Sequence, residues 1–173
     1  MAPCPQPSST ATPTFLIPFA LRTSGCNAIK EQGSDSAPVR TIAFIIIDHR
    51  CSNSYNKIAT IEELDVNFLG LQAALRKVEN AIPDGSLLVT NGISAIRQVL
   101  HPLALRLSFR LSPLFYKFID ISRFEALPLD ENCSLEDELN LICDRIQYLC
   151  EVYRVNHIFL LAKYSKNCNQ DEL

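Results

Sequence analysis

The sequence predicts one α/β domain whose sheet is covered by helices on both faces. Residues 41–48, TIAFIIID, are continuously apolar and rich in β-branched side chains, which is typical of a strand buried on both sides. Residues 68–82 carry apolar side chains at helical spacing. Segments with strand and helix patterns alternate along the chain, and this alternation is characteristic of α/β domains.

Composition sets outer limits on function. The 173 residues are 47% hydrophobic and 20% charged, which suits one globular core. The net charge of −3 argues against an overall basic nucleic-acid binder. No apolar run reaches the roughly 18 residues that span a bilayer, and the N-terminus lacks the positive region of a secretory signal. We therefore expect an intracellular chain with no membrane partner.

The seven cysteines include no C-x-x-C pair, so we expect mostly reduced thiols packed as small apolar side chains. His49, Cys51 and Cys143 lack the ligand spacing of a zinc site. The sequence accordingly predicts no metal and no other cofactor.

The chain divides into a leader, a domain and a tail. Residues 1–12 are rich in Pro, Ser and Thr and are expected to be disordered. The domain is expected over residues 13–165, followed by a flexible tail over 166–173. Within the domain, Pro18 interrupts the first apolar run, FLIPFAL, and predicts an edge strand at best.

The middle of the chain supplies two helices and three strands after TIAFIIID. A weak strand is expected over 57–61, and a helix follows with Asn67 as its cap and Pro83-Asp84-Gly85 as its stop. Residues 86–90 form the next strand, and residues 93–107 the second helix, which Pro102 should bend. Residues 115–121 are expected to form another strand.

The last helix begins at Ser134, where Asp137 completes a capping box. Its apolar stripe consists of Leu135, Leu139, Ile142, Ile146 and Leu149. Residues 156–162, NHIFLLA, fit either a strand or a further helical turn, because periodicity does not distinguish the two in so short a run.

The order of these elements resembles the DEDDh 3′-to-5′ exonuclease branch of the ribonuclease H-like fold. The likeness rests on the strand ending in Asp48, the strand-turn-helix over 86–102, the strand ending near Asp120 and the helix opening at NCSLED. It implies a mixed sheet with helices on both faces. That family holds two Mg²⁺ ions with four carboxylates and uses a histidine as general base. Several negative ligands are needed because the two cations repel each other.

Carried over to this sequence, the family's motifs are incomplete. The first, Asp-x-Glu at the end of the first strand, corresponds to Asp48-x-Arg50, with Arg50 in place of the glutamate. The second aspartate corresponds to Ala95. The third motif, His-x4-Asp, corresponds to Asn132 and Asp137. The resemblance therefore implies a degenerate site with no catalytic residue, in which the guanidinium of Arg50 would repel Mg²⁺.

Ordinary structural roles compete with these assignments. Asp48 could cap the exit of its strand, and Asp137 could serve only as the capping residue of the last helix. Asn132 is of a residue type that forms turns. His101 has no neighbouring nucleophile or orienting acid in the sequence, which favours a structural role.

A more specific resemblance lies in TNGISAIRQVLHPLA, followed by LFYKFIDISRFE. Both segments are similar to the N-terminal domain of the epithelial splicing regulatory proteins and their insect relative Fusilli, and the likeness covers roughly residues 14–150. In that family the exonuclease-like domain precedes RNA-recognition motifs that steer alternative splicing. The resemblance implies RNA and splicing-related proteins as partners and the nucleus as location. No RNP-type aromatic signature is present in the 173 residues.

Charge is distributed unevenly along the chain. Residues 85–119 contain no acid but include Arg97, Arg106, Arg110 and Lys117, whereas residues 130–151 are strongly acidic. The four basic residues are our candidates for RNA phosphate contacts, which would weaken steeply with salt. An ordinary solvated helix face is the competing interpretation.

The leading hypothesis is a catalytically inactive, exonuclease-like domain of a splicing regulator that contacts proteins or, weakly, RNA. The alternative is an active metal-dependent 3′-to-5′ exonuclease with rearranged ligands. Asp48, Asp137 and Asp120 would then share the metals, with His49 or His101 as base. A third possibility is an unrelated α/β domain.

Overall fold

The computed structural model describes residues 15–24, 38–48, 56–57, 61–124, 127, 133–152 and 166–167. The expectations for residues 1–12 and 156–162 lie outside these ranges. The strands are β1 Phe15–Thr23, β2 Val39–Phe44, β3 Ile47–Asp48, β4 Asn56–Lys57, β5 Glu62–Asp65, β6 Ser86–Thr90, β7 Lys117–Asp120 and β8 Lys166–Asn167. The helices are α1 Val66–Leu69, α2 Leu71–Ala81, η1 Ser94–Leu100, α3 His101–Arg106, η2 Pro113–Tyr116, η3 Ile121–Arg123 and α4 Leu135–Val152.

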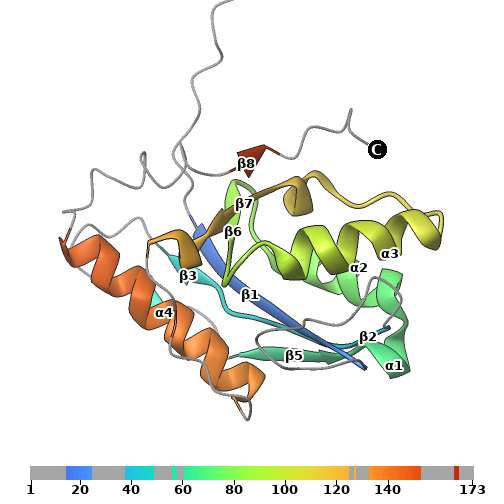
Figure 1. Ribbon diagram of the computed structural model, residues 1–173, viewed down its shortest axis with the longest axis horizontal. Helices are drawn as coiled ribbons and strands as arrows, with labels where there is room; N and C mark the ends of the chain where they lie inside the picture. Colours follow the sequence, from blue (N-terminus) through green and yellow to red (C-terminus); the bar gives the residue numbers. More distant parts are fainter. Residues whose placement is uncertain are drawn as a thin grey trace, which may run out of the picture.

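The strands form one mixed sheet around β1 (Figure 1). β1 runs parallel to β6, and β6 runs parallel to β7. On its other edge β1 pairs antiparallel with β2 along its second half and with β3 at its start. The continuous strand predicted for residues 41–48 is thus divided into β2 and β3 at residues 45–46. Of the weak strand predicted over 57–61, Lys57 belongs to β4, residues 58–60 lie outside the described ranges, and β5 begins at Glu62 and pairs with β2.

The prediction that FLIPFAL forms at best an edge strand was wrong, because β1 lies in the middle of the sheet. Its carbonyl at Pro18 accepts a hydrogen bond from the N–H of Ile45, 3.1 Å away, at the break between β2 and β3. The nitrogen and oxygen of one strand residue point to the same side. The missing N–H of Pro18 therefore faces an interruption in the neighbouring strand, where no regular ladder bond is lost.

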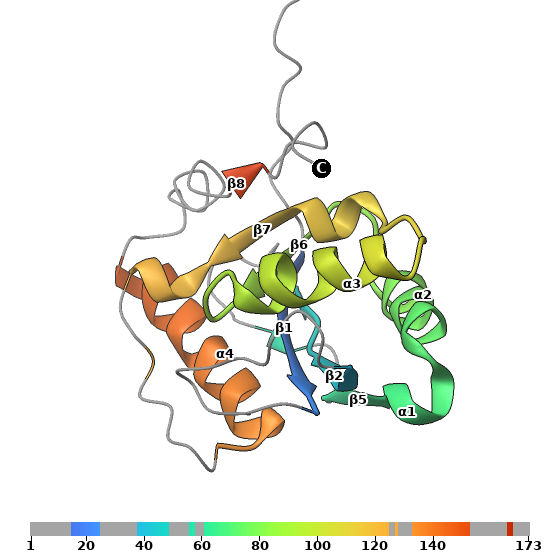
Figure 2. The ribbon, with the colours of Figure 1, turned by 45° about the vertical axis from the view of Figure 1, so that its right-hand side comes forward.

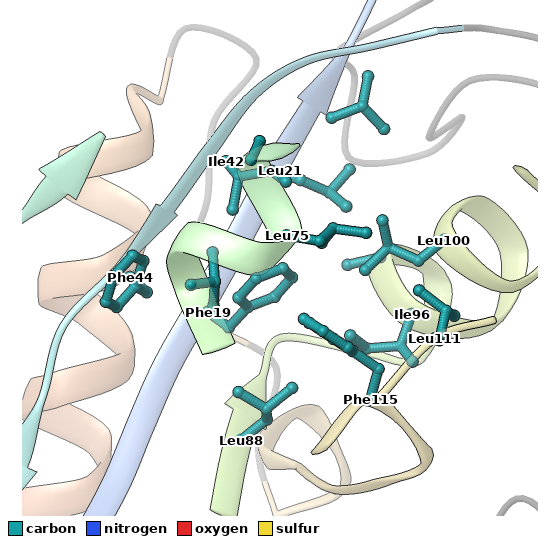
Figure 3. Packing of buried hydrophobic residues seen from close by; sticks show 14 of the residues in the cluster. Phe19, Leu21, Ile42, Phe44, Leu75, Leu88, Ile96, Leu100, Leu111 and Phe115 are labelled. Carbon is teal, nitrogen blue, oxygen red and sulfur yellow. The ribbon is translucent and has the colours of Figure 1, made fainter. Parts of the chain in front are cut away.

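Two apolar cores cover the two faces of the sheet. The α4-side core combines Leu16, Ala20 and Ile47 of the sheet with the stripe of α4. Every residue of that predicted stripe is buried. The α3-side core combines Phe19, Leu88 and Phe115 with α2, η1 and α3 (Figure 3). There the rings of Phe19 and Phe115 meet edge to face, 6.0 Å between centroids. Continuous burial of residues 16–21 and 42–47 explains why these segments do not alternate between apolar and polar side chains.

The predicted helix over residues 67–82 is interrupted. The carboxylate of Asp65, not Asn67, caps α1 and accepts from the N–H groups of Asn67 and Phe68. Gly70 has a φ of 78°, which glycine adopts without steric cost and which separates α1 from α2. Phe68 is 86% exposed and does not join the core as the spacing had suggested.

The helix predicted over residues 93–107 is present, but its hydrogen-bonding pattern changes from π to α just before Pro102. The N–H of His101 bonds to the carbonyl of Ile96, five residues back, so η1 is a π-helix. Regular α geometry begins at His101, and Pro102 occupies the first turn of α3, where a missing N–H is tolerated.

The capping box predicted for the last helix is confirmed. Ser134 Oγ accepts from the N–H of Asp137 at 3.0 Å, and Asp137 Oδ2 accepts from the N–H of Ser134 at 3.2 Å. Cys143 is buried in the α4-side core and Cys133 is half-buried, as expected for cysteines packed as small apolar side chains. Within the described residues, no helix is long and apolar enough to cross a membrane.

Candidate functional site

The parallel strands bring one carboxylate to the turn that opens the strand-turn-helix. Thr90 at the end of β6 lies in register with Asp120 at the end of β7. Asp120 Oδ1 accepts from the N–H of Gly92 at 3.0 Å and from the Ser122 hydroxyl at 2.6 Å. Arg123 Nε lies 3.5 Å from the other carboxylate oxygen. Asp120 therefore closes this turn structurally, with donors on both oxygens.

The backbone of the same turn requires glycine. Gly92 has a φ of 87°, and its carbonyl accepts from the Thr90 hydroxyl at 2.7 Å. Ala95, the position expected for the second aspartate, is 6% exposed and packs in the α3-side core. A carboxylate could not replace it there without burying a charge.

The two aspartates expected to survive from the metal site do not lie together. Asp48 is paired with Phe15 at the start of β1. The α4 start is held at the other end of β1, where Arg22 Nη2 donates to the Cys133 carbonyl at 3.1 Å. Phe15 and Arg22 are about 20 Å apart along an extended strand. Asp48 and the start of the helix that Asp137 caps therefore lie toward opposite ends of β1, which does not favour their assignment to a single metal site.

The first strand of the fold also differs from the one assumed in the sequence comparison. That strand is β1, which is parallel to β6 and contains no acidic residue. The segment TIAFIIID, which supplied Asp48 as the first motif, is the second element and runs antiparallel to it. Arg50 and Asn132 lie outside the described residues, as do His49 and His157.

Asp137 acts as the capping residue. The Ser134 hydroxyl and N–H both donate to its carboxylate, and these hydrogen bonds hold the pKa of Asp137 below its ordinary value. The side chain is exposed. A helix cap fully accounts for its position in the sequence.

A buried ion pair joins β1 to α4. Arg22 Nη1 lies 2.5 Å from Glu138 Oε2, and the two side chains are only 20% and 7% exposed. The same guanidinium reaches the carbonyls of Leu21 and Cys133. Sequence reasoning missed this pair because its members are 116 residues apart. The signal that could have found it is an arginine inside an otherwise apolar strand.

The described residues contain no group of three or more His, Cys, Asp or Glu side chains placed to hold a metal ion. His101 is engaged structurally as well, because its Nε2 lies 3.0 Å from the Phe115 carbonyl and its ring packs on Tyr116. Among the described residues, His101 is therefore not placed as a general base beside a cluster of carboxylates.

The four basic residues considered for RNA contact are spread over η1, α3, a loop and β7. Arg106, Arg110 and Lys117 are exposed, and Arg97 is half-buried. Arg110 lines a pocket with Arg76 of α2, a residue the sequence argument did not consider.

Comparisons with known proteins agree with the observed topology. No protein-family model matches the chain, and no curated protein matches it by sequence. Among solved structures, the nuclease domain of 3′hExo, a DEDDh family member bound to rAMP, is similar with a TM-score of 0.58 and 9% identity. That match covers 84% of this chain and 96% of the other.

Two further structures show the same likeness. Cell-death related nuclease 4 (CRN-4) has a TM-score of 0.54 and 9% identity over 82% of this chain and 65% of its own. A 3′-exonuclease described in 3′-end-specific recognition of the histone mRNA stem-loop has a TM-score of 0.57 and 8% identity, over 83% and 84%. The fold is therefore ribonuclease H-like and exonuclease-like, as the element order had predicted.

Proposed function

We propose that this chain is an exonuclease-like domain that does not cut nucleic acid and serves as a binding module in RNA processing. The main observation behind this proposal concerns the acidic residues that the described structure places on or next to β1. β1 itself offers none, and it contributes the guanidinium of Arg22 to the buried interface with α4.

Three carboxylates of the described residues support this proposal because each already has an ion-pair or hydrogen-bond partner. Glu138 is paired with Arg22, Asp120 accepts from the Gly92 and Ser122 donors, and Asp137 caps α4. Two-metal hydrolysis needs several carboxylates that converge on two ions. An always-charged guanidinium beside Glu138 opposes the binding of a divalent cation there.

The alternative, an active 3′-to-5′ exonuclease with rearranged ligands, is favoured by the solved structures of similar fold, which are nucleases by description. Its proposed ligand set is disfavoured, because Asp48 pairs with the start of β1 whereas the helix capped by Asp137 is held at the other end of β1. Asp120 would have to act with other ligands.

The biological setting is proposed from the resemblance of TNGISAIRQVLHPLA and LFYKFIDISRFE to the epithelial splicing regulatory proteins. On that basis the partners are RNA and splicing-related proteins, and the location is the nucleus. One structure of similar fold recognises the histone mRNA stem-loop, which supports RNA as a partner class. Exposed Arg106, Arg110 and Lys117 are the described side chains available for phosphate contacts, and Arg97 is less accessible.

Activity is tested with 5′-labelled single-stranded RNA, incubated with the purified chain and Mn²⁺ and resolved on a denaturing gel. We expect the full-length band to persist. Progressive shortening from the 3′ end that disappears in both Asp120→Asn and Asp48→Asn chains, but persists in an Asp84→Asn control, would refute the proposal. Asp84 lies exposed in the turn after α2, far in sequence from either strand end.

A further inference from the structure

A pocket of about 300 Å³ opens between α2 and the loop that follows α3. Its apolar lining includes Leu75 of α2 and Phe109 and Leu111 of the loop. Arg76, Arg110 and Glu79 supply its charged lining. Figure 2 shows the end of α3 beside α2, with α1 adjacent, so the pocket belongs to the side of the molecule opposite α4. None of Asp120, Asp137, Glu138 and His101, described above, lines this pocket.

The loop wall of this pocket is held in place by defined backbone contacts. Ser108 ends α3 with a φ of 54°, and the N–H of Phe109 bonds back to the Ala104 carbonyl at 3.0 Å. Together with the bond from the Ser108 N–H to the Leu105 carbonyl, this forms a Schellman motif. Glu79 accepts a hydrogen bond from the backbone of Ser112, which ties the loop to α2. The pocket is therefore built by two anchored elements.

The lining of the pocket is apolar at its centre. Leu75, Phe109 and Leu111 supply this apolar part, from α2 on one side and the loop after α3 on the other. An apolar pocket between two anchored elements suits an apolar side chain of a protein partner.

The charges around the pocket are mainly positive. Arg76 and Arg110 of the lining are exposed, and no acid occurs between residues 85 and 119. Glu79 is the single acid among the lining residues, and it is already bonded to the Ser112 backbone and close to Arg76. A complementary occupant therefore carries negative groups around an apolar one.

From this arrangement we infer that the pocket docks a peptide segment of a protein partner. A large apolar side chain of that segment enters between Leu75 and Phe109, and its acidic residues face Arg76 and Arg110. The inference rests on the proposed role as a binding module and names the chemistry of the partner. RNA would also satisfy the arginines, but a phosphate backbone would leave the apolar lining of Leu75, Phe109 and Leu111 without a partner, which favours a peptide.

The test selects binders from a displayed library of random 12-residue peptides, using the whole chain as bait. We expect enrichment of sequences with Leu or Phe flanked by Asp or Glu. The Kd of a selected, fluorescein-labelled peptide should rise about tenfold or more in the Arg76→Glu/Arg110→Glu chain, because two attractions become repulsions. The Lys77→Glu/Arg40→Glu chain makes the same change in charge at exposed residues outside the pocket and should leave Kd within about twofold.

Three results would overturn the inference. They are failure to enrich any such peptide, equal weakening by both double variants, and single-stranded RNA binding that is lost only in the Arg76→Glu/Arg110→Glu chain. Thermal melts of both variants, followed by circular dichroism, establish that the comparison is between folded proteins. Nuclease activity is measured separately on labelled RNA. A chain that neither cuts RNA nor selects acidic peptides refutes the docking site alone, and a chain that cuts RNA refutes the proposed function.

Discussion

Removing one partner of the Arg22–Glu138 pair should destabilise this domain strongly. Replacing Arg22 with methionine retains much of the apolar volume in β1 but leaves the Glu138 carboxylate, 7% exposed, without its guanidinium. Removing one member of a buried ion pair costs about 3–5 kcal/mol, since the other charge stays buried and uncompensated. The 20% exposure of Arg22 allows some water to enter, so we expect about 3 kcal/mol for Arg22→Met.

Glu138→Gln should cost less, about 1–2 kcal/mol, because Arg22 keeps its bond to the Cys133 carbonyl and a neutral acceptor in place of the carboxylate. The double variant Arg22→Met/Glu138→Leu buries no charge, so it should be more stable than Arg22→Met alone. The surface pair Arg123–Asp120 gives the matched control. Arg123 is 39% exposed, and Arg123→Met should cost less than about 1 kcal/mol.

Equilibrium unfolding in urea measures all four variants. With a slope of about 1.5–2 kcal/mol per molar urea, Arg22→Met should lower the midpoint by roughly 1.5–2 M. A loss below about 1 kcal/mol for Arg22→Met, or a double variant no more stable than Arg22→Met alone, would show that the buried Glu138 charge does not depend on Arg22 and would refute this reasoning.

Three further predictions concern single residues. Ser108→Gly should raise the free energy of unfolding by about 0.5–1 kcal/mol in thermal or urea melts. Glycine removes the strain of the left-handed φ of 54° in the folded state, and this gain should exceed the stabilisation of the unfolded state by glycine's greater flexibility. Ser134→Ala should lower it by about 1 kcal/mol through loss of the α4 cap, and an unchanged midpoint would contradict the capping role. Burial raises the pKa of Glu79 above its ordinary 4.5, so the native chain binds more protons and its stability falls as pH rises through the range above 4.5. The stability of Glu79→Gln relative to the unmodified chain should therefore increase with pH over that range, and a difference independent of pH would exclude this effect.

The same linkage argument applies with opposite sign to Asp137. Its pKa is lowered below the ordinary 3.8 by the Ser134 hydrogen bonds, so its contribution is present above 3.8 and is lost as pH falls through the lower, folded pKa. Comparison of unfolding curves for the unmodified chain and Asp137→Asn below pH 3.8 measures this loss.

Local signals predicted much of the fold. The capping box at Ser134 and the apolar stripe of α4 are short-range features, and both are present in the structure. The strand at 86–90 and the helix after it follow from the same kind of pattern. Their reliability has a physical basis, because capping and amphipathic spacing depend on residues within one or two turns.

Features that depend on pairing between distant segments were not predicted correctly. Pro18 indicated an edge strand, since the break at residues 45–46 that accommodates it belongs to another part of the chain. That error also shifted the comparison with exonuclease motifs from β1 to the strand ending in Asp48. The Arg22–Glu138 pair and the pocket between Arg76 and Arg110 likewise require the tertiary fold.

The strand-turn-helix over 86–102 keeps its turn through hydrogen bonds among its own residues and Asp120. Its glycine, its threonine and Asp120 form a closed set of hydrogen bonds, and the position expected to carry a ligand is buried Ala95. Under the proposed function, this scaffold serves binding.

Metal binding is the property that most directly distinguishes an active exonuclease from a binding module. Isothermal titration of Mn²⁺ into the chain at neutral pH, up to millimolar metal, should give no saturable heat beyond dilution if the carboxylates are engaged as described. Saturable binding at two ions per chain that is lost in Asp120→Asn would contradict the account and place an intact metal site in this domain.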